Sequence, residues 1–416
     1  MAIIPAELFL NVAKIYYRME KSKKILIFST AYYPLVGGAE VAIKEITDRI
    51  EGVQFDLITA KFDSNLLKFE RVGNVNVHRL GFGFKTLDKL LLPFWGAIFA
   101  LNLNNKNHYD YFWCVMASFA SGAAYIANML KFWRPVPIIL NLQEGDSEDH
   151  FKKRWFGLIN LSWRVALSRT QKLTVLSSFL AQRAKKFGYN GEINIIPNGV
   201  DIQKFEVRDT SYEKEEIEKI RRDLGIKEGE IALVTVSRLN IKNGVADVIK
   251  ALVKLSENIK FLILGDGELR KDLEGLTKSL KVSDRVIFKG FVSHDDMPKY
   301  LHACDIFIRA SLSEGFGNSF IEAMACKLPV IATPVGGIPD FLKDHETGYF
   351  CEVKNSGSIA DTVQKVIVDP DKNKIIENAY NMVLEKYSWD LIANQMKEVF
   401  GRAPKDVSSA PKARFC

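Results

Sequence analysis

The chain has 416 residues, too many for one ordinary hydrophobic core, so its length predicts two domains. Apolar and charged fractions of 47% and 26% are those of a soluble globular protein. The net charge of +7 is concentrated in the first half, because residues 1–200 hold 25 basic and 16 acidic side chains while residues 201–416 hold 32 and 34. Ordinary solubility explains this excess, and so does attraction to anionic lipid or to an anionic acceptor.

Cysteines, histidines and apolar runs exclude several classes of protein. Five scattered cysteines without a C-x-x-C spacing indicate reduced thiols in a cytoplasmic protein, not a disulfide framework or a zinc site. The six histidines show no H-E-x-x-H pattern, so no protein-held metal is expected. The longest uncharged apolar run, Leu90–Leu103, is shorter than the ~20 residues of a membrane span and is interrupted by Pro93. We therefore expect no membrane crossing, and the N-terminus shows no signal-peptide pattern.

After an amphipathic lead-in over residues 1–22, short apolar runs alternate with helical patterns such as Val41–Ile50. The predicted strands of the first half are Ile25–Ser29, Val53–Thr59, Val75–Leu80, Tyr111–Met116, Pro137–Leu142 and Lys172–Ser177. A turn-rich exit at 195–201 and a charged helical stretch, Glu213–Glu230, precede a second series. Its predicted strands are Ile231–Ser237, Ile259–Leu264, Arg285–Phe288, Ile306–Ile308 and Val330–Thr333, before a last helical stretch, Ile375–Phe400. This alternation predicts two mainly parallel sheets covered by helices on both faces.

Glycines stand between the first predicted strand and its helix. Gly37 and Gly38 allow a ligand to approach the backbone closely, although a plain tight turn is the simpler interpretation. A dinucleotide fingerprint would need G-x-G-x-x-G, which this segment lacks. Asp56 lies near the position of a ribose-binding acid, but without the glycine spacing this position alone is weak support for that role.

In the second half, most loops that follow a strand contain glycine or charge. Arg238 and Lys242 follow the first of these strands, where two cations suit a pyrophosphate or are ordinary surface charges. The most informative segment runs from Glu314 to Glu322, because Gly315-Phe316-Gly317 separates the first carboxylate from a helix that carries the second. Free backbone N–H groups at that helix N-terminus favour a site for phosphate and sugar.

Together these motifs resemble retaining glycosyltransferase family 4. They are Ser237-Arg238-Leu239 with Lys242-Asn243-Gly244, Gly265-Asp266-Gly267, Gly290 to His294, Glu314 to Gly317 with Glu322-Ala323, and Val335 to Pro339. Gly37-Gly38, residues 198–201 and Tyr387-Ser388-Trp389 extend the resemblance over nearly the whole chain. The resemblance implies an α/β fold of the GT-B type, in which two Rossmann-like domains with mainly parallel sheets face an interdomain cleft.

The resemblance also implies an organisation and a reaction. Residues 1–200 would bind the acceptor, residues 201–385 would bind the donor, and residues 386–400 would form a closing helix that returns to the first domain. The polar tail over residues 401–416 is expected to be disordered. A sugar would pass from a nucleotide-diphosphate sugar, which is a substrate and not a cofactor, to a saccharide or lipid-linked acceptor. Neither a metal nor nucleic acid is implied.

Site residues follow from the positions that match the family. Arg238 and Lys242 would stabilise the leaving diphosphate, and Glu314 would lie near the sugar hydroxyls without acting as a glycosidase-type nucleophile. Glu322 would accept hydrogen bonds from the donor ribose. The donor-binding residues implied are Gly37, Gly38, Gly265, Phe291, Phe316, Gly317, Asn318 and Glu322.

Two positions depart from the family pattern. In many relatives a lysine immediately precedes the glycine, whereas Asn243 stands there in this chain and Lys242 lies one position earlier. Many relatives also have a histidine after the strand Pro137–Leu142, where this chain has Gln143-Glu144-Gly145-Asp146. Gln143 would then contact the sugar, and Glu144 or Asp146 would bind the acceptor or act as a base.

Other interpretations remain open on the sequence. The aromatic and cationic segments His150–Arg164 and Gly81–Leu103 are either core helices or a peripheral contact with anionic lipid at the inner face of the cell membrane. A nucleotide-sugar epimerase of related fold and a non-catalytic nucleotide-sugar-binding protein are the alternative functions. A nicotinamide oxidoreductase is disfavoured, because the dinucleotide fingerprint is missing.

Overall fold

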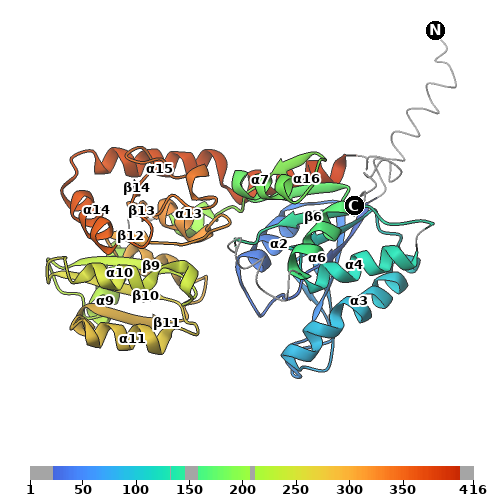
Figure 1. Ribbon diagram of the computed structural model, residues 1–416, viewed down its shortest axis with the longest axis horizontal. Coiled ribbons are helices and arrows are strands. Elements are labelled where there is room, and N and C mark those ends of the chain that lie inside the picture. Colours follow the sequence, from blue (N-terminus) through green and yellow to red (C-terminus); the bar gives the residue numbers. More distant parts are fainter. Residues whose placement is uncertain (1–21, 132, 146–157, 207–210, 403–416) are drawn as a thin grey trace, which may run out of the picture.

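The computed structural model describes residues 22–131, 133–145, 158–206 and 211–402. The lead-in predicted over residues 1–22 lies outside these residues except for Ser22, as does most of the segment His150–Arg164. The tail predicted as disordered over residues 401–416 also lies outside them, except that Gly401 is ordered as the last residue of a helix and Arg402 follows it. Figure 1 shows two lobes side by side, each with a sheet flanked by helices. The expected GT-B arrangement of two Rossmann-like units is confirmed.

The first lobe is built on a sheet of eight described strands in the order β3-β4-β2-β1-β5-β6-β7-β8. Only the β3–β4 pair is antiparallel within this sheet. The strands are β1 (Lys23–Phe28), β2 (Val53–Ala60), β3 (Phe69–Val72), β4 (Val75–Leu80), β5 (Tyr111–Val115), β6 (Ile138–Leu142), β7 (Lys172–Val175) and β8 (Ile193–Ile195). The helices are α2 (Gly38–Arg49), α3 (Lys85–Asn107), α4 (Phe119–Leu130), α6 (Leu158–Ser168) and α7 (Ser178–Lys186).

The second lobe has six described strands in the order β11-β10-β9-β12-β13-β14, all paired in parallel. They are β9 (Ile231–Val236), β10 (Ile259–Leu264), β11 (Val286–Gly290), β12 (Ile306–Arg309), β13 (Val330–Ala332) and β14 (Tyr349–Phe350). The segments around them are α8 (Ile202–Phe205), α9 (Ser211–Asp223), η2 (Ile241–Asn243), α10 (Val245–Leu252), α11 (Arg270–Ser279), η3 (Ser283–Arg285), α12 (Met297–His302), α13 (Asn318–Ala325), η4 (Ile338–Asp340), α14 (Ser356–Val368) and α15 (Lys372–Lys386). The last helix, α16 (Trp389–Gly401), lies on the first lobe. Each predicted strand of both halves corresponds to one of these strands.

Helix α3 corrects the expectation that Pro93 interrupts its apolar run. The helix continues through Pro93 for 23 residues and is long and apolar enough to span a membrane by length and composition alone. One face is buried, and a Cβ placed on Gly96 would lie 2.8 Å from the Ala123 Cβ of α4. Pro93 of α3 lies close to Gly122 of α4. Because α3 is packed against α4 and β2, it lies on the first lobe as a surface helix.

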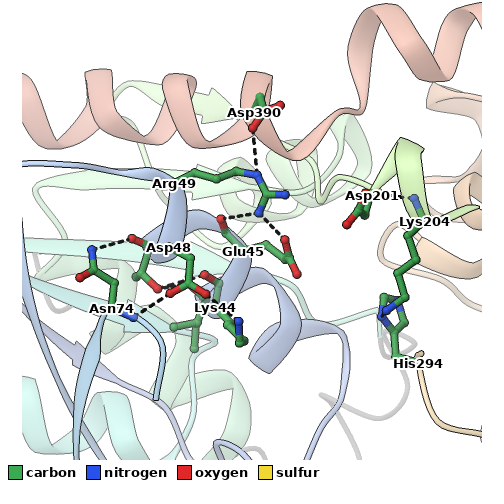
Figure 2. A network of polar contacts seen from close by, with 11 residues as sticks. Lys44, Glu45, Asp48, Arg49, Asn74, Asp201, Lys204, His294 and Asp390 are labelled. Carbon is green, nitrogen blue, oxygen red and sulfur yellow. Dashed lines mark hydrogen bonds and ion pairs between the residues drawn. The ribbon is translucent and has the colours of Figure 1, made fainter. Parts of the chain in front are cut away.

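The last helical stretch is two helices, not one. It breaks at Tyr387-Ser388, where the Ser388 hydroxyl accepts a hydrogen bond from the Leu391 N–H at 3.3 Å and so caps α16. Helix α16 packs against α2 in the first lobe, with Phe400 in contact with the Trp113 ring. Figure 2 shows Arg49 of α2 donating to Asp390 at 2.9 Å. The C-terminal helix therefore fastens the second lobe to the first.

Candidate active site

The candidate site lies at the carboxyl edge of the second sheet, where the strand order reverses between β9 and β12. Loops after β9, β10, β11, β12 and β13 all leave the sheet at this edge. Ligands of doubly wound sheets bind at such a switch point. Every site residue predicted in the second half lies in one of these loops or on α13, which follows β12.

Close approach of the backbone locks the loops after β9, β10 and β11 together. Gly265 has a φ of 137° and donates its N–H to the Gly290 carbonyl at 2.7 Å. A Cβ at Gly265 would overlap the Ser237 carbonyl, so only glycine fits. The next residue after Gly290, Phe291, has 78% of its surface exposed. Its ring is available to stack on a planar base.

Helix α13 begins at a glycine with left-handed geometry. Gly317 has a φ of 96°, and a Cβ there would lie 2.6 Å from the Phe320 ring. The Phe316 ring is buried against Phe341 and Tyr387, so its backbone and not its side chain is available to line a ligand. The Asn318 end of α13 presents the positive end of the helix dipole to the site.

Glu322 lies on α13 and is largely buried, with 9% of the residue exposed. Its Oε1 lies 3.1 Å from Nε2 of His294, in the loop after β11. His294 ends the Gly290–His294 motif, but no role for its side chain could be predicted from the sequence. Only the folded structure shows that His294 lies beside a carboxylate on α13.

Glu314 is paired with Arg309, which was not among the site residues predicted from the sequence. Arg309, at the end of β12, has 9% of its surface exposed and forms an ion pair with Glu314. The other oxygen of Glu314 accepts the Gly315 N–H at 3.1 Å. Arg309 also donates to the Ser311 hydroxyl at 3.1 Å and to the Ser319 hydroxyl at 3.0 Å. The signal for Arg309 in the sequence was a charged residue at the end of the apolar run Ile306–Ile308.

The two predicted cations differ in their surroundings. Arg238 is exposed, and within the described ranges its guanidinium has no hydrogen bond or ion pair. Lys242 lies on η2 and is partly exposed. Asn243, in the position where many relatives have lysine, is buried and bridges two site residues. It donates to the Arg238 carbonyl at 2.6 Å and accepts from Arg309 at 3.2 Å.

The first lobe reaches the site through the N-terminus of α2. A Cβ placed on Gly38 would lie 3.2 Å from the side-chain nitrogen of Asn318, so the N-termini of α2 and α13 face one another. The Gly37 N–H donates to Glu40 at 2.8 Å. Burial raises the pKa of the Glu40 carboxyl, and the nearby Arg238 charge opposes that rise. Gly265 and Phe291 lie further along the edge, after β10 and β11.

The loop after β6 contacts the Glu314 loop directly. The Ser313 hydroxyl donates to the Gly145 carbonyl at 2.5 Å, and a Cβ on Gly145 would overlap the Gly315 N–H group. In this loop the Gln143 amide donates to Asn141 at 2.6 Å, while the Glu144 carboxylate accepts the Gln143 N–H at 3.0 Å and the Ala117 N–H. Glu144 therefore stabilises the loop itself. Asp146 lies outside the described residues.

Asp56 is not part of this site. It lies within β2, away from the sheet edge, and accepts hydrogen bonds from Tyr109 at 2.8 Å and Asn76 at 3.2 Å. These bonds and His78 lower the pKa of its carboxyl despite burial. Asp56 is thus a satisfied internal acid.

Comparisons with known proteins agree with this geometry. The sequence model described as Glycosyltransferase Family 4 matches residues 36–204, and the one described as Glycosyl transferases group 1 matches residues 216–382. An uncharacterized glycosyltransferase of Methanocaldococcus jannaschii is 28% identical over 91% of this chain and 97% of its own length. Alpha-monoglucosyldiacylglycerol synthase of Streptococcus pneumoniae is 25% identical over 88% of this chain and 83% of its own length.

Solved structures share the fold at lower identity. Sucrose-phosphate synthase from Thermosynechococcus elongatus superposes with a TM-score of 0.78 at 20% identity, over 91% of this chain and 98% of its own. The Anabaena protein HepE, solved with UDP and glucose, gives a TM-score of 0.73 at 22% identity, over 91% and 99%. Fold and sequence together define a glycosyltransferase of the GT-B class. The chain belongs to glycosyltransferase family 4.

Proposed function

We propose that the protein transfers a sugar from a nucleotide-diphosphate sugar to a saccharide or lipid-linked acceptor with retention of configuration. The observation that carries this proposal is the facing pair of helix N-termini, α2 at Gly38 and α13 at Asn318, beside the exposed Arg238. Two helix dipoles and a guanidinium converge there, and Arg238 forms no ion pair among the described residues, although its charge acts on the nearby Glu40 carboxyl. A diphosphate satisfies all three groups at once.

The same arrangement supports a leaving-group role for the cations. Breaking the bond between the anomeric carbon and phosphate leaves negative charge on the diphosphate, and Arg238 and Lys242 would stabilise it. The sugar meanwhile gains positive charge at the anomeric carbon. Both oxygens of Glu314 already accept hydrogen bonds, from Arg309 and from the Gly315 N–H, which makes it a poor nucleophile. These contacts favour a reaction in which the enzyme supplies no covalent partner.

A uridine nucleotide is the first donor class to test, because HepE was solved with UDP and glucose. Thermal shifts with UDP-, ADP- and GDP-sugars would identify the donor, since a ligand at 100 times its Kd stabilises the fold by about 2.7 kcal/mol. Glu322→Ala should weaken the selected donor about tenfold or more, because a hydrogen bond to a charged group is lost.

Product analysis would separate the functions. Transfer to an acceptor, or donor hydrolysis, with the α-anomeric configuration conserved in the proton NMR spectrum supports the proposal. Inversion of the anomeric centre contradicts retention. Conversion of one nucleotide sugar into its epimer would show an epimerase, and binding without turnover under any acceptor would show a binding protein.

The acceptor side of the first lobe favours a lipid-linked substrate at a membrane. The outward face of α3 exposes apolar side chains, with Phe94 60% and Ile98 58% exposed. The members of this face, named here the α3 apolar face, are Leu87, Leu90, Phe94, Trp95 and Ile98, with Phe82 and Phe84 just before the helix. A helix that exposes apolar rings toward solvent is typical of one lying in a lipid interface.

Positive charge on the same surface is complementary to anionic lipid. Lys85 and Lys89 are exposed beside the α3 apolar face. The acidic residue of α3, Asp88, is buried and accepts the N–H groups of Phe82 at 2.9 Å and Gly83 at 2.8 Å. Lys89 also lies 5.2 Å from the Phe119 ring at the start of α4. The surface therefore runs from α3 toward the loop that Glu144 holds, next to the Glu314 loop.

Vesicle flotation tests this surface. Replacing Phe94 and Ile98 together by serine should reduce binding to phosphatidylglycerol vesicles at least about tenfold, because burying each side chain contributes about 1.5–3 kcal/mol when complete. Val368→Ser is the matched control, since Val368 is 77% exposed on the second lobe. If the wild-type protein does not bind anionic vesicles at low salt, or if the double variant binds them as well as the wild type does, the proposed membrane contact is wrong.

A further inference from the structure

A line of three polar side chains connects the segment between the lobes with Glu322. Lys204 Nζ lies 3.1 Å from His294 Nδ1, and His294 Nε2 lies 3.1 Å from Glu322 Oε1. Lys204 belongs to α8, which follows the first lobe and is capped by Asp201 through the Lys204 N–H at 3.2 Å. Figure 2 shows the Lys204 side chain extending from α8 to the His294 ring.

The chemistry of these groups fixes the direction of both hydrogen bonds. A lysine ammonium has donors and no acceptor, so Nδ1 of His294 must accept from Lys204. The imidazole proton then resides on Nε2 and is donated to Glu322. The remaining Lys204 contact, to Asp295 Oδ1 at 2.6 Å, also uses an ammonium proton. The Phe205 ring lies 5.5 Å from the His294 ring and restricts its position.

Glu322 depends on this imidazole. Among the described residues, His294 is the side chain that donates to its carboxylate, and the contact occupies Oε1. The second oxygen, Oε2, has no partner in the part of the chain that the structure describes. A largely buried carboxylate with one oxygen anchored and one free is oriented to accept hydroxyl donors from a ligand.

We propose that Lys204 and His294 are positioning residues that orient Glu322 toward the ribose of the donor. This inference rests on the proposed function, because it takes Glu322 as the group that accepts from the ribose hydroxyls. Lys204 sets the tautomer, His294 anchors Oε1, and Oε2 meets the ribose. Since Lys204 lies in the segment that joins the lobes, ribose recognition is coupled to the position of α8.

Discrimination between ribose and deoxyribose measures this role separately from folding. UDP, ADP and GDP are first titrated into the wild-type protein by calorimetry, and the tightest is compared with its 2′-deoxy form. His294→Leu should weaken the ribonucleotide about tenfold and leave the 2′-deoxy form nearly unchanged, because the oriented contact is lost. His294→Gln, whose amide nitrogen reaches the position of Nε2, should recover most of the discrimination.

Two further variants test the direction of the line. Lys204→Met should lower the ratio of ribonucleotide affinity to 2′-deoxynucleotide affinity about threefold, because the imidazole can then carry its proton on either nitrogen. Asp295→Ala removes the exposed second partner of Lys204 and should leave the ratio unchanged. Wild-type protein that binds none of the three nucleotides would overturn the proposed function. If His294→Leu discriminates between ribose and deoxyribose as well as the wild type does, the positioning role alone is wrong. The same conclusion follows if His294→Gln fails to restore that discrimination.

Discussion

Replacing Arg238 by alanine is expected to lower kcat about 100- to 1000-fold, the usual effect of removing one preorganised group from a developing negative charge. Arg238 stands two residues after the end of β9, where the sheet order reverses, and its charge lies near Glu40 in the first turn of α2. Because its guanidinium has no hydrogen bond or ion pair among the described residues, the change should alter the free energy of unfolding by less than about 0.5 kcal/mol. Initial rates at saturating donor and a thermal melt measure the two quantities.

Matched variants sharpen this experiment. Arg238→Lys keeps the charge but loses the planar fork, so it should fall between the wild type and Arg238→Ala. Arg222→Ala is the control, because Arg222 is exposed and its one ion pair among the described residues is an i, i+4 pair with Glu218. Full turnover in Arg238→Ala would show that the leaving diphosphate is neutralised elsewhere. Lys242 would be the first group to examine in that case.

The strands and the edge that carries the loops could be predicted from the sequence. Buried parallel strands contain continuous apolar runs, such as Phe261–Leu264, and each run marks where its loop begins. The missed strands lack this signal. β3 alternates exposed and half-buried residues on the sheet edge, while β8 and β14 have three and two residues. An edge strand or a very short strand offers no apolar run to detect.

Side-chain partners from distant loops could not be predicted. Glu314 and Glu322 were identifiable as a pair by their spacing around glycines, but their partners come from other strands. Arg309 ends β12, and His294 follows β11. The path of α3 was also hidden, because Pro93 suggests a break. In the structure Pro93 packs against Gly122 of α4, and α3 continues through the proline as one long helix.

Replacing Arg309 by methionine is expected to destabilise the protein by about 3–5 kcal/mol, the cost of removing one partner from a buried ion pair. Four acceptors lose a donor in this variant: the Glu314 carboxylate, the side-chain amide oxygen of Asn243, and the hydroxyls of Ser311 and Ser319. The flexible methionine fills most of the volume, so the loss reports on polar contacts and not on a cavity. Urea unfolding followed by circular dichroism measures it.

A double-mutant cycle then assigns the energy to the pair. Glu314→Gln removes the carboxylate charge, so the combined Arg309→Met and Glu314→Gln variant should be more stable than Arg309→Met alone. Equal stability of the single and double variants would mean that Arg309 acts through Asn243 and the serines instead. The distinction matters for the site, because Asn243 also holds the Arg238 carbonyl at 2.6 Å. One buried guanidinium would then support both the sugar-side carboxylate and the loop that presents the cation to the diphosphate.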